Sequence, residues 1–200
     1  MKDTTIDYYD NNATTYANLT VHADLSTLYT DFLQYLTHGA SILDLGCGSG
    51  RDSRYFIELG YDVEAIDGSI ELCKIASEYI KKPVRHLTFQ SLDYNNRFDG
   101  IWACSSLLHI EKKLLPEVLL KIYNALKSNG ILYASFKYGS FTGERSGRFF
   151  QDLTEYEFMN IIKQVHGLEI IKSYISNDVR PDRHDEKWIN VFLRKSVGNL

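Results

Sequence analysis

Hydrophobic positions along this chain first follow a helical period. Between residues 23 and 37 they recur every three or four residues, at Leu25, Leu28, Tyr29, Phe32, Leu33 and Leu36. This spacing predicts an amphipathic helix, and Gly39 follows it as a candidate C-cap. A second helix is expected before it, over residues 5–20.

After Gly39 the pattern changes to short apolar runs that alternate with helical segments. The runs predict five strands: Ser41–Leu45, Tyr61–Ile66, Val84–Phe89, Phe98–Cys104 and Ile131–Phe136. The segments between or after them predict four helices: Arg51–Leu59, Ser69–Ile80, Leu114–Leu126 and Thr154–Val165, the last with a capping box from Thr154 to Glu157. This alternation is typical of a parallel sheet covered by helices on both faces.

Two further strands, Leu168–Ile175 and Trp188–Arg194, have no helix between them. We expect them to pair as an antiparallel hairpin joined by a long loop. The predicted fold is therefore doubly wound α/β and Rossmann-like. Its seven-stranded, mostly parallel sheet ends in an antiparallel C-terminal hairpin. One domain, residues 1–200, would contain N-terminal cap helices (1–38) and the core (39–200).

Composition and charge argue against several classes of function. The chain has 200 residues, 44% hydrophobic and 24% charged, with a net charge of −4, so a strong field for a nucleic-acid backbone is not expected. The N-terminus is polar, and no apolar run reaches the roughly 18 residues of a membrane helix. The three cysteines form no metal-binding spacing. We expect a cytoplasmic protein, monomeric or homodimeric, with no membrane partner; a nucleic-acid substrate is disfavoured but not excluded.

A glycine-rich loop, Gly46–Gly50, follows the first predicted strand and precedes a helix. Glycines permit close approach of the backbone to a ligand. A pyrophosphate at this helix would be repelled by Asp44, whereas a ligand with a cationic amine would be attracted. Asp67 ends the next strand about 20 residues on, where a carboxylate accepts the hydroxyls of a ribose.

Four segments resemble the motifs of class I S-adenosylmethionine (SAM)-dependent methyltransferases. Residues 42–50, ILDLGCGSG, resemble motif I, and residues 63–69, VEAIDGS, resemble the second motif. Residues 98–110, FDGIWACSSLLHI, are similar to the fourth strand and its loop, and ALKSNG at 125–130 to the turn into the fifth strand. The nearest resemblance is to the small tellurite-resistance and UbiE-like bacterial enzymes.

The resemblance implies SAM as the cofactor, and it implies a set of contacts. Glycines of the loop would line the methionine part, Asp67 would hold the ribose, and an N-terminal tyrosine would cover the methionine end. The residues implied are Tyr8, Tyr16, Asp44, Gly46, Cys47, Gly48, Gly50, Arg51, Asp67, Gly68, Ser69, Ser91, Leu92, Asp93 and Cys104.

The methyl acceptor is less constrained. The Asn/Asp-Pro-Pro-aromatic run of base N-methyltransferases is absent after the fourth strand, so we expect a small-molecule acceptor, with anionic compounds the first candidates. Catalytic candidates are His109 and Tyr16. Candidate acceptor contacts are His109, Lys137, Tyr138, Arg148, Arg180 and Arg183, and residues 139–147 form a candidate lid loop. Structural roles remain open for these residues: packing or helix capping for His109 and packing for Tyr16, a solvated loop for Lys137 and Tyr138, an ordinary flexible connection for residues 139–147, and surface ion pairs for Arg180 and Arg183.

Other functions remain open at this stage. An RNA or protein methyltransferase would share the cofactor motifs. A non-catalytic SAM-binding regulator would also share them and would be excluded by turnover of SAM. An NAD-dependent dehydrogenase is disfavoured because the loop reads GxGxG with Asp44 upstream rather than GxGxxG.

Overall fold

A seven-stranded sheet forms the centre of the protein. The computed structural model describes residues 4–180, 183 and 185–196. The strand order is β3-β2-β1-β4-β5-β9-β8, and the first five strands are parallel while β9 is antiparallel to both neighbours. Their bounds are β1 Ser41–Leu45, β2 Asp62–Asp67, β3 Val84–His86, β4 Phe98–Ala103, β5 Leu126–Lys137, β8 Leu168–Asn177 and β9 Lys187–Lys195.

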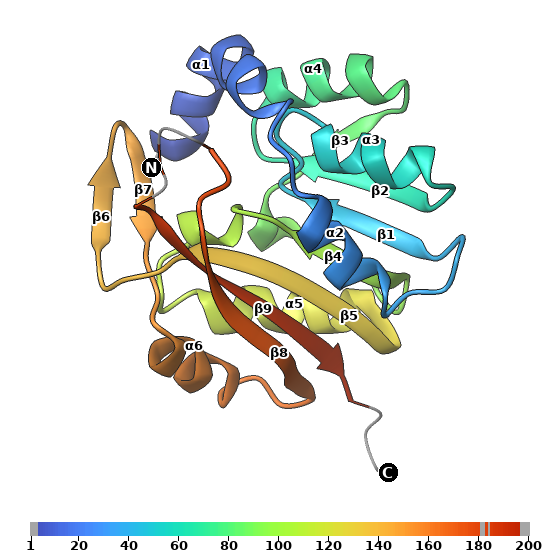
Figure 1. The fold of residues 1–200 in the computed structure, drawn as a ribbon, viewed down its shortest axis with the longest axis vertical. Coiled ribbons are helices and arrows are strands. Elements are labelled where there is room, and N and C mark those ends of the chain that lie inside the picture. The colour runs from blue at the N-terminus through green and yellow to red at the C-terminus, as the bar shows by residue number, and fades with distance from the viewer. Residues whose placement is uncertain (1–3, 181–182, 184, 197–200) are drawn as a thin grey trace.

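Helices cover both faces of this sheet (Figure 1). Buried side chains of α2 and α3 pack on one face, and those of α5 and α6 pack on the other. The helices are α1 Thr4–Thr20, α2 Ser26–Leu33, α3 Arg51–Glu58, α4 Ile70–Ile80, α5 Leu115–Ala125 and α6 Glu155–Ile162, with short 3₁₀ turns η1 Phe89–Ser91 and η2 Leu107–His109. No helix within the described residues is long and apolar enough to cross a membrane.

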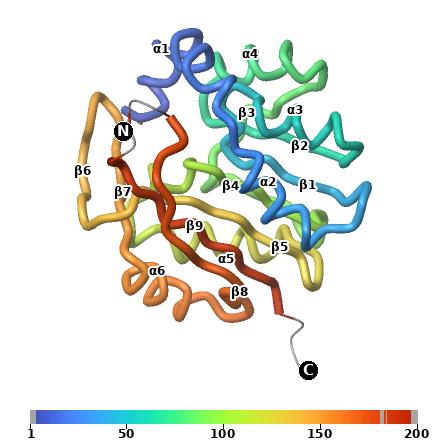
Figure 2. The backbone as a smooth tube through the Cα atoms, in the orientation of Figure 1, coloured from blue at the N-terminus to red at the C-terminus, as the bar shows by residue number. Residues whose placement is uncertain are grey.

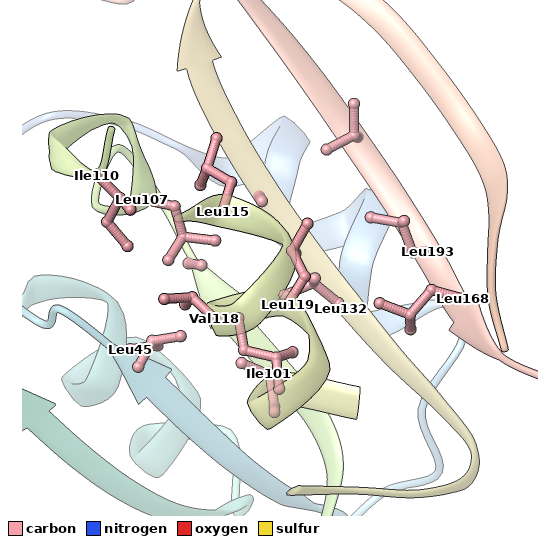
Figure 3. Packing of buried hydrophobic residues seen from close by; sticks show 14 of the residues in the cluster. Leu45, Ile101, Leu107, Ile110, Leu115, Val118, Leu119, Leu132, Leu168 and Leu193 are labelled. Carbon is pink, nitrogen blue, oxygen red and sulfur yellow. The ribbon is translucent and has the colours of Figure 1, made fainter. Parts of the chain in front are cut away.

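Alternation along the strands explains the two-sided core. Ile101 of β4 and Leu132 of β5 face α5, where Val118 and Leu119 meet them (Figure 3). Their neighbour Trp102 points to the opposite face, into the cluster formed with α2 and α3. Central parallel strands bury apolar side chains on both faces of the sheet. Their sequences are therefore continuous apolar runs.

The predicted doubly wound fold with its antiparallel C-terminal pair is confirmed. The strand expected over Val84–Phe89 is shorter, because the chain turns into η1 after β3. Strand β5 is longer than expected. It begins at Leu126 and contains Asn129 with φ +62°, next to a register shift opposite β4.

The expected lid loop over residues 139–147 is largely a β-hairpin instead. Strands β6 (Thr142–Arg145) and β7 (Arg148–Gln151) pair antiparallel, with Ser146 and Gly147 at the turn. Both turn residues have positive φ, +49° and +77°, which suits a tight hairpin connection. The glycines that suggested a loop are therefore elements of a hairpin.

Helix α1 spans from α4 to this hairpin, at the edge where the parallel strands end (Figures 1 and 2). Ser69 at the start of α4 donates a hydrogen bond to Asp10, with 2.6 Å between the two oxygens. At the other side, the backbone N–H of Phe149 donates to the hydroxyl of Thr5 at 3.0 Å. The first helix thereby covers the carboxyl ends of β1, β2 and β4, where ligands of such folds bind.

Candidate cofactor and acceptor site

Two adjoining cavities lie beneath α1. The α1 cavity runs between α1, the end of β2 and η1. The β9 cavity runs between the glycine loop, α2, β5 and β9. Seven residues line both: Tyr9, Tyr16, Gly46, Gly48, Cys104, Ser105 and His109. The two cavities therefore meet at the start of the glycine loop and the end of β4.

The glycine loop is packed so closely that side chains are excluded. Gly46 has φ +82°, and a Cβ there would lie 2.6 Å from Cβ of Ser106. Gly48 has φ +55°, and a Cβ would lie 3.2 Å from the ring of Tyr16. Both conformations favour glycine. Gly50 lines neither cavity, and a Cβ there would press on Ala76 and Ile80 of α4, so its role is packing between α3 and α4.

Asp67 is fixed at the boundary of the α1 cavity by the backbone. One carboxylate oxygen accepts from the N–H of Gly48 at 2.9 Å, and the other accepts from the N–H of Ser69 at 2.8 Å. Burial raises the pKa of this carboxyl group, although the two N–H donors oppose the shift. Each carboxylate oxygen retains acceptor capacity, and Asp67 lines the α1 cavity.

The residues that line the far end of the α1 cavity differ from the predicted cofactor contacts. Thr88, Phe89 and Gln90 line it, whereas Ser91, Leu92 and Asp93 do not. Leu92 is buried in the core, and Ser91 is exposed and accepts a hydrogen bond from Thr88. The shift arises because the chain coils into η1 and so turns the residues just before Ser91 toward the cavity.

Ser106 carries an unsatisfied polar atom in this cavity. Its side chain is 5% exposed, and its hydroxyl oxygen makes no hydrogen bond. A buried hydroxyl without a partner costs roughly 1–3 kcal/mol. Since Ser106 lines the α1 cavity, a bound polar ligand would satisfy it.

Asp52 was not anticipated, yet it organises one wall of the β9 cavity. Its carboxylate accepts from Arg51 at 2.5 and 3.0 Å, from Tyr29 at 2.6 Å and from Trp102 at 2.8 Å. Burial opposes ionisation, but Arg51 and these hydrogen bonds keep the pKa of Asp52 low. Arg51, which lines the β9 cavity, is thereby held in one orientation.

Asp44 lies behind the glycine loop and lines neither cavity. Its carboxylate accepts from the hydroxyl of Ser53 at 2.5 Å. Burial and the negative charge of Asp52 raise the pKa of Asp44 to about 8. The structure therefore places Asp44 in a buried network with Ser53, away from direct ligand contact.

Tyr9, one of the N-terminal tyrosines expected to cover the cofactor, lines both cavities. Its hydroxyl lies 2.8 Å from Nε2 of His109, while Nδ1 of His109 lies 2.6 Å from the carbonyl oxygen of Phe149. A carbonyl only accepts, so Nδ1 carries a proton and Nε2 of neutral His109 accepts from Tyr9. The sequence spacing indicates that Tyr9 shares the position of Tyr16, because residues seven apart lie on one face of a helix.

Of the six remaining predicted cofactor residues, five line a cavity and one does not. Tyr16, Cys47, Gly68, Ser69 and Cys104 each line at least one cavity. Burial raises the pKa of Tyr16, and it raises the pKa of the Cys104 thiol to about 12, so both are protonated at neutral pH. Tyr8 lines neither cavity and packs against Gly147 and Arg148 instead.

Of the predicted acceptor contacts, five line the β9 cavity: His109, Lys137, Arg148, Arg180 and Arg183. Lys137 and Arg183 pair with Glu186, and Arg180 pairs with Asp178 at 2.6 Å. Burial lowers the pKa of Lys137 to about 8. Tyr138 lies outside both cavities and donates to Glu155.

Known proteins share both the sequence motifs and the fold. Residues 42–130 match the family model described as "Methyltransferase domain". Malonyl-[acyl-carrier protein] O-methyltransferase of Salmonella typhimurium is 43% identical over 118 residues, covering 56% of this chain and 45% of that protein. Glycine/sarcosine N-methyltransferase of Aphanothece halophytica is 31% identical over 122 residues, covering 56% and 46%. The chain thus spans about half the length of these relatives.

Solved structures extend the likeness to nearly the whole chain. The 1,6-didemethyltoxoflavin-N1-methyltransferase of Burkholderia thailandensis, solved with S-adenosylhomocysteine (SAH), has a TM-score of 0.79 at 20% identity, covering 96% of this chain and 87% of that one. A TehB-like SAM-dependent methyltransferase of Corynebacterium glutamicum has a TM-score of 0.72 at 22% identity, covering 95% and 99%. Residues 42–130 therefore match a methyltransferase family model, and nearly the whole chain shares the fold of solved SAM-dependent methyltransferases.

Proposed function

We propose that this chain binds SAM across the α1 cavity and the glycine loop and methylates a small, anionic acceptor in the β9 cavity. One observation carries the proposal: the two cavities meet at Tyr9, Tyr16, Cys104 and His109. A methyl group on a sulfonium bound at this junction would face the β9 cavity. That is the arrangement an in-line transfer requires.

The described residues fit SAM in three respects. Gly46 and Gly48 leave room for a ligand against the backbone, and Asp67 presents carboxylate oxygens for ribose hydroxyls. Ile6, Leu72, Phe89 and Ile110 give the α1 cavity apolar walls for a flat base. The unsatisfied hydroxyl of Ser106 gains a polar partner.

The β9 cavity supports a small polar acceptor. Its floor contains Tyr133, which donates to Asn190 at 2.8 Å, and Asn190 in turn donates to Ser176 at 2.9 Å. Five basic residues line it, Arg51, Lys137, Arg148, Arg180 and Arg183, against two lining carboxylates, Asp52 and Asp178. Two relatives act, by their names, on malonyl and on glycine or sarcosine groups, which carry carboxylates.

When bound, SAM supplies an electrophilic methyl group on a sulfonium, and the protein supplies positioning and proton transfer. His109 would accept a proton through Tyr9, whose hydroxyl lies 2.8 Å from Nε2 of His109. In the proposed transfer the acceptor heteroatom would bond to the methyl carbon, and the S–CH₃ electron pair would stay on sulfur. The acceptor proton passes to the oxygen of Tyr9, and the hydroxyl proton of Tyr9 passes to Nε2 of His109. The products are SAH, the methylated acceptor and a protonated His109, so charge is conserved.

The test is a screen with SAM labelled in its methyl group. The purified protein is incubated with a panel of small hydroxy, amino and thiol carboxylic acids, and SAH and labelled products are quantified by mass spectrometry. We expect acceptor-dependent SAH formation with at least one anionic compound. SAH formation only with RNA or protein acceptors would contradict the small-molecule proposal, and the absence of any SAM turnover would favour a binding function.

A further inference from the structure

Arg148 differs from the other basic residues of the β9 cavity in its lack of a counter-ion. Arg180 pairs with Asp178, and Lys137 and Arg183 pair with Glu186. Among the residues that the structure describes, no carboxylate lies within ion-pair distance of Arg148. Its positive charge is therefore uncompensated within a cavity.

Most hydrogen-bonding capacity of this guanidinium is also unused. A guanidinium has five N–H donors, and the described partner of Arg148 is the hydroxyl of Tyr9, 3.4 Å from one terminal nitrogen. Nε is buried and makes no hydrogen bond. A buried charged donor without a partner is costly, so a ligand that accepts from it would bind favourably.

Aromatic rings hold the guanidinium in place. Its central carbon lies 4.6 Å from the ring centroid of Tyr8, 5.2 Å from that of Phe150 and 5.6 Å from that of Tyr9. Cation–π contacts of this kind stabilise the charge but leave the N–H edge of the group available. The side chain comes from β7, next to Phe149, whose carbonyl orients His109.

We propose that Arg148 is the anchor for a carboxylate of the acceptor, and that Tyr9 and His109 lie beside the atom to be methylated. This inference rests on the proposed function. A planar carboxylate matches the fork of the guanidinium, and its single negative charge matches the single unpaired positive charge. A phosphate dianion would leave one negative charge uncompensated among aromatic rings. The paired residues Lys137, Arg180 and Arg183 shape the cavity wall instead.

The test uses acetate as the probe and the Nε–H resonance of Arg148 as the readout. This resonance is identified by its loss in Arg148→Gln. Acetate, inorganic phosphate and chloride are titrated at constant ionic strength, with and without saturating SAH. SAH affinity is measured calorimetrically on the same samples. Arg85→Gln is the matched control, because Arg85 lies on β3, lines neither cavity, and shares Glu64 with Arg97.

We expect acetate to shift the Arg148 resonance saturably, and phosphate to do so more weakly. Because Arg148→Gln lacks this resonance, its acetate affinity is measured by calorimetry, and it should be about ten- to hundredfold weaker than that of the wild type, the worth of a charged bidentate contact. Arg148→Lys should also weaken it, because an ammonium lacks the fork. Arg85→Gln should match the wild type. An unshifted Arg148 resonance, equal shifts by chloride, tighter binding of phosphate, or unchanged acetate affinity in Arg148→Gln would each overturn the assignment.

The experiment tests the carboxylate site at Arg148 and the methyltransferase function independently. Loss of acetate binding at Arg148 with normal SAH binding would remove the carboxylate anchor and leave the methyltransferase proposal standing. Loss of SAH binding with an intact acetate response would contradict the methyltransferase proposal and leave the carboxylate site at Arg148 standing. This outcome can be observed because the acetate titration is also run without SAH.

Discussion

The hydroxyl of Tyr9 lies 2.8 Å from Nε2 of His109, and this hydrogen bond joins the first helix to the loop after β4. Burial raises the pKa of Tyr9, so the hydroxyl is protonated at neutral pH and donates to the imidazole. One residue comes from the N-terminal cap and the other from the core of the fold. The site is therefore completed only when α1 is in place.

Removing the Tyr9 hydroxyl should affect turnover more than cofactor binding. In Tyr9→Phe the ring and its packing remain, but no proton can pass to His109. We expect kcat with an acceptor from the screen to fall by about 10²- to 10⁴-fold, the usual contribution of general acid–base catalysis. Steady-state kinetics would measure this, with SAH affinity as the internal control. A kcat close to that of the wild type would exclude Tyr9 from proton transfer.

Gly48→Ala should weaken SAH binding beyond the effect of backbone strain. Gly48 has φ +55°, and an added Cβ would meet the ring of Tyr16 at 3.2 Å. Gly39→Ala is a matched control, since Gly39 has φ +78° and nothing within 4 Å of its Cβ position. Both variants should lose about 1 kcal/mol of stability in chemical denaturation.

Only Gly48→Ala should lower SAH affinity, by about tenfold or more. Equal affinities in the two variants would show that the loop backbone does not contact the cofactor.

Asp44 should make stability depend on pH. Its pKa in the folded protein, about 8, lies above the value of about 4 in an unfolded chain. The folded state therefore binds the proton more tightly, and the stability from Asp44 is fully present below about pH 4 and lost as pH rises toward 8.

The free energy of unfolding of Asp44→Asn should consequently fall less between these pH values than that of the wild type. Denaturation curves at several pH values would test this. Parallel curves for the two proteins would show that Asp44 is ionised in the fold.

Much of the fold is predictable because its determinants are local. Strand β1 coincides with its predicted bounds, since a continuous apolar run followed by glycines has one simple interpretation. The capping box of Thr154 and Glu157 is present as expected, because it depends on residues three positions apart. The hairpin of β6 and β7 was missed, since glycine-rich segments with few apolar residues resemble loops.

The site was harder to predict where it depends on tertiary contacts. Gly46, Gly48 and Asp67 follow from motif position, and the structure brings them together. Asp52 has no motif, and besides two hydrogen bonds from its neighbour Arg51 it accepts one from Tyr29 of α2 and one from Trp102 of β4. The distinction between Arg148 and Arg180 depends on which arginine has a carboxylate neighbour. Asp178 lies only two residues from Arg180, so that pairing is local in sequence, whereas the lack of a carboxylate beside Arg148 among the described residues depends on the tertiary structure.

The most direct test of the account is calorimetric titration of the wild type and Asp67→Ala with SAM, SAH and NAD. We expect the wild type to bind SAM and SAH with micromolar affinity and not to bind NAD. Asp67→Ala should bind SAH at least about tenfold more weakly, because a charged hydrogen-bonding contact is lost. Binding of NAD in place of SAM, or an unchanged SAH affinity in Asp67→Ala, would contradict the assignment of the α1 cavity as the cofactor site.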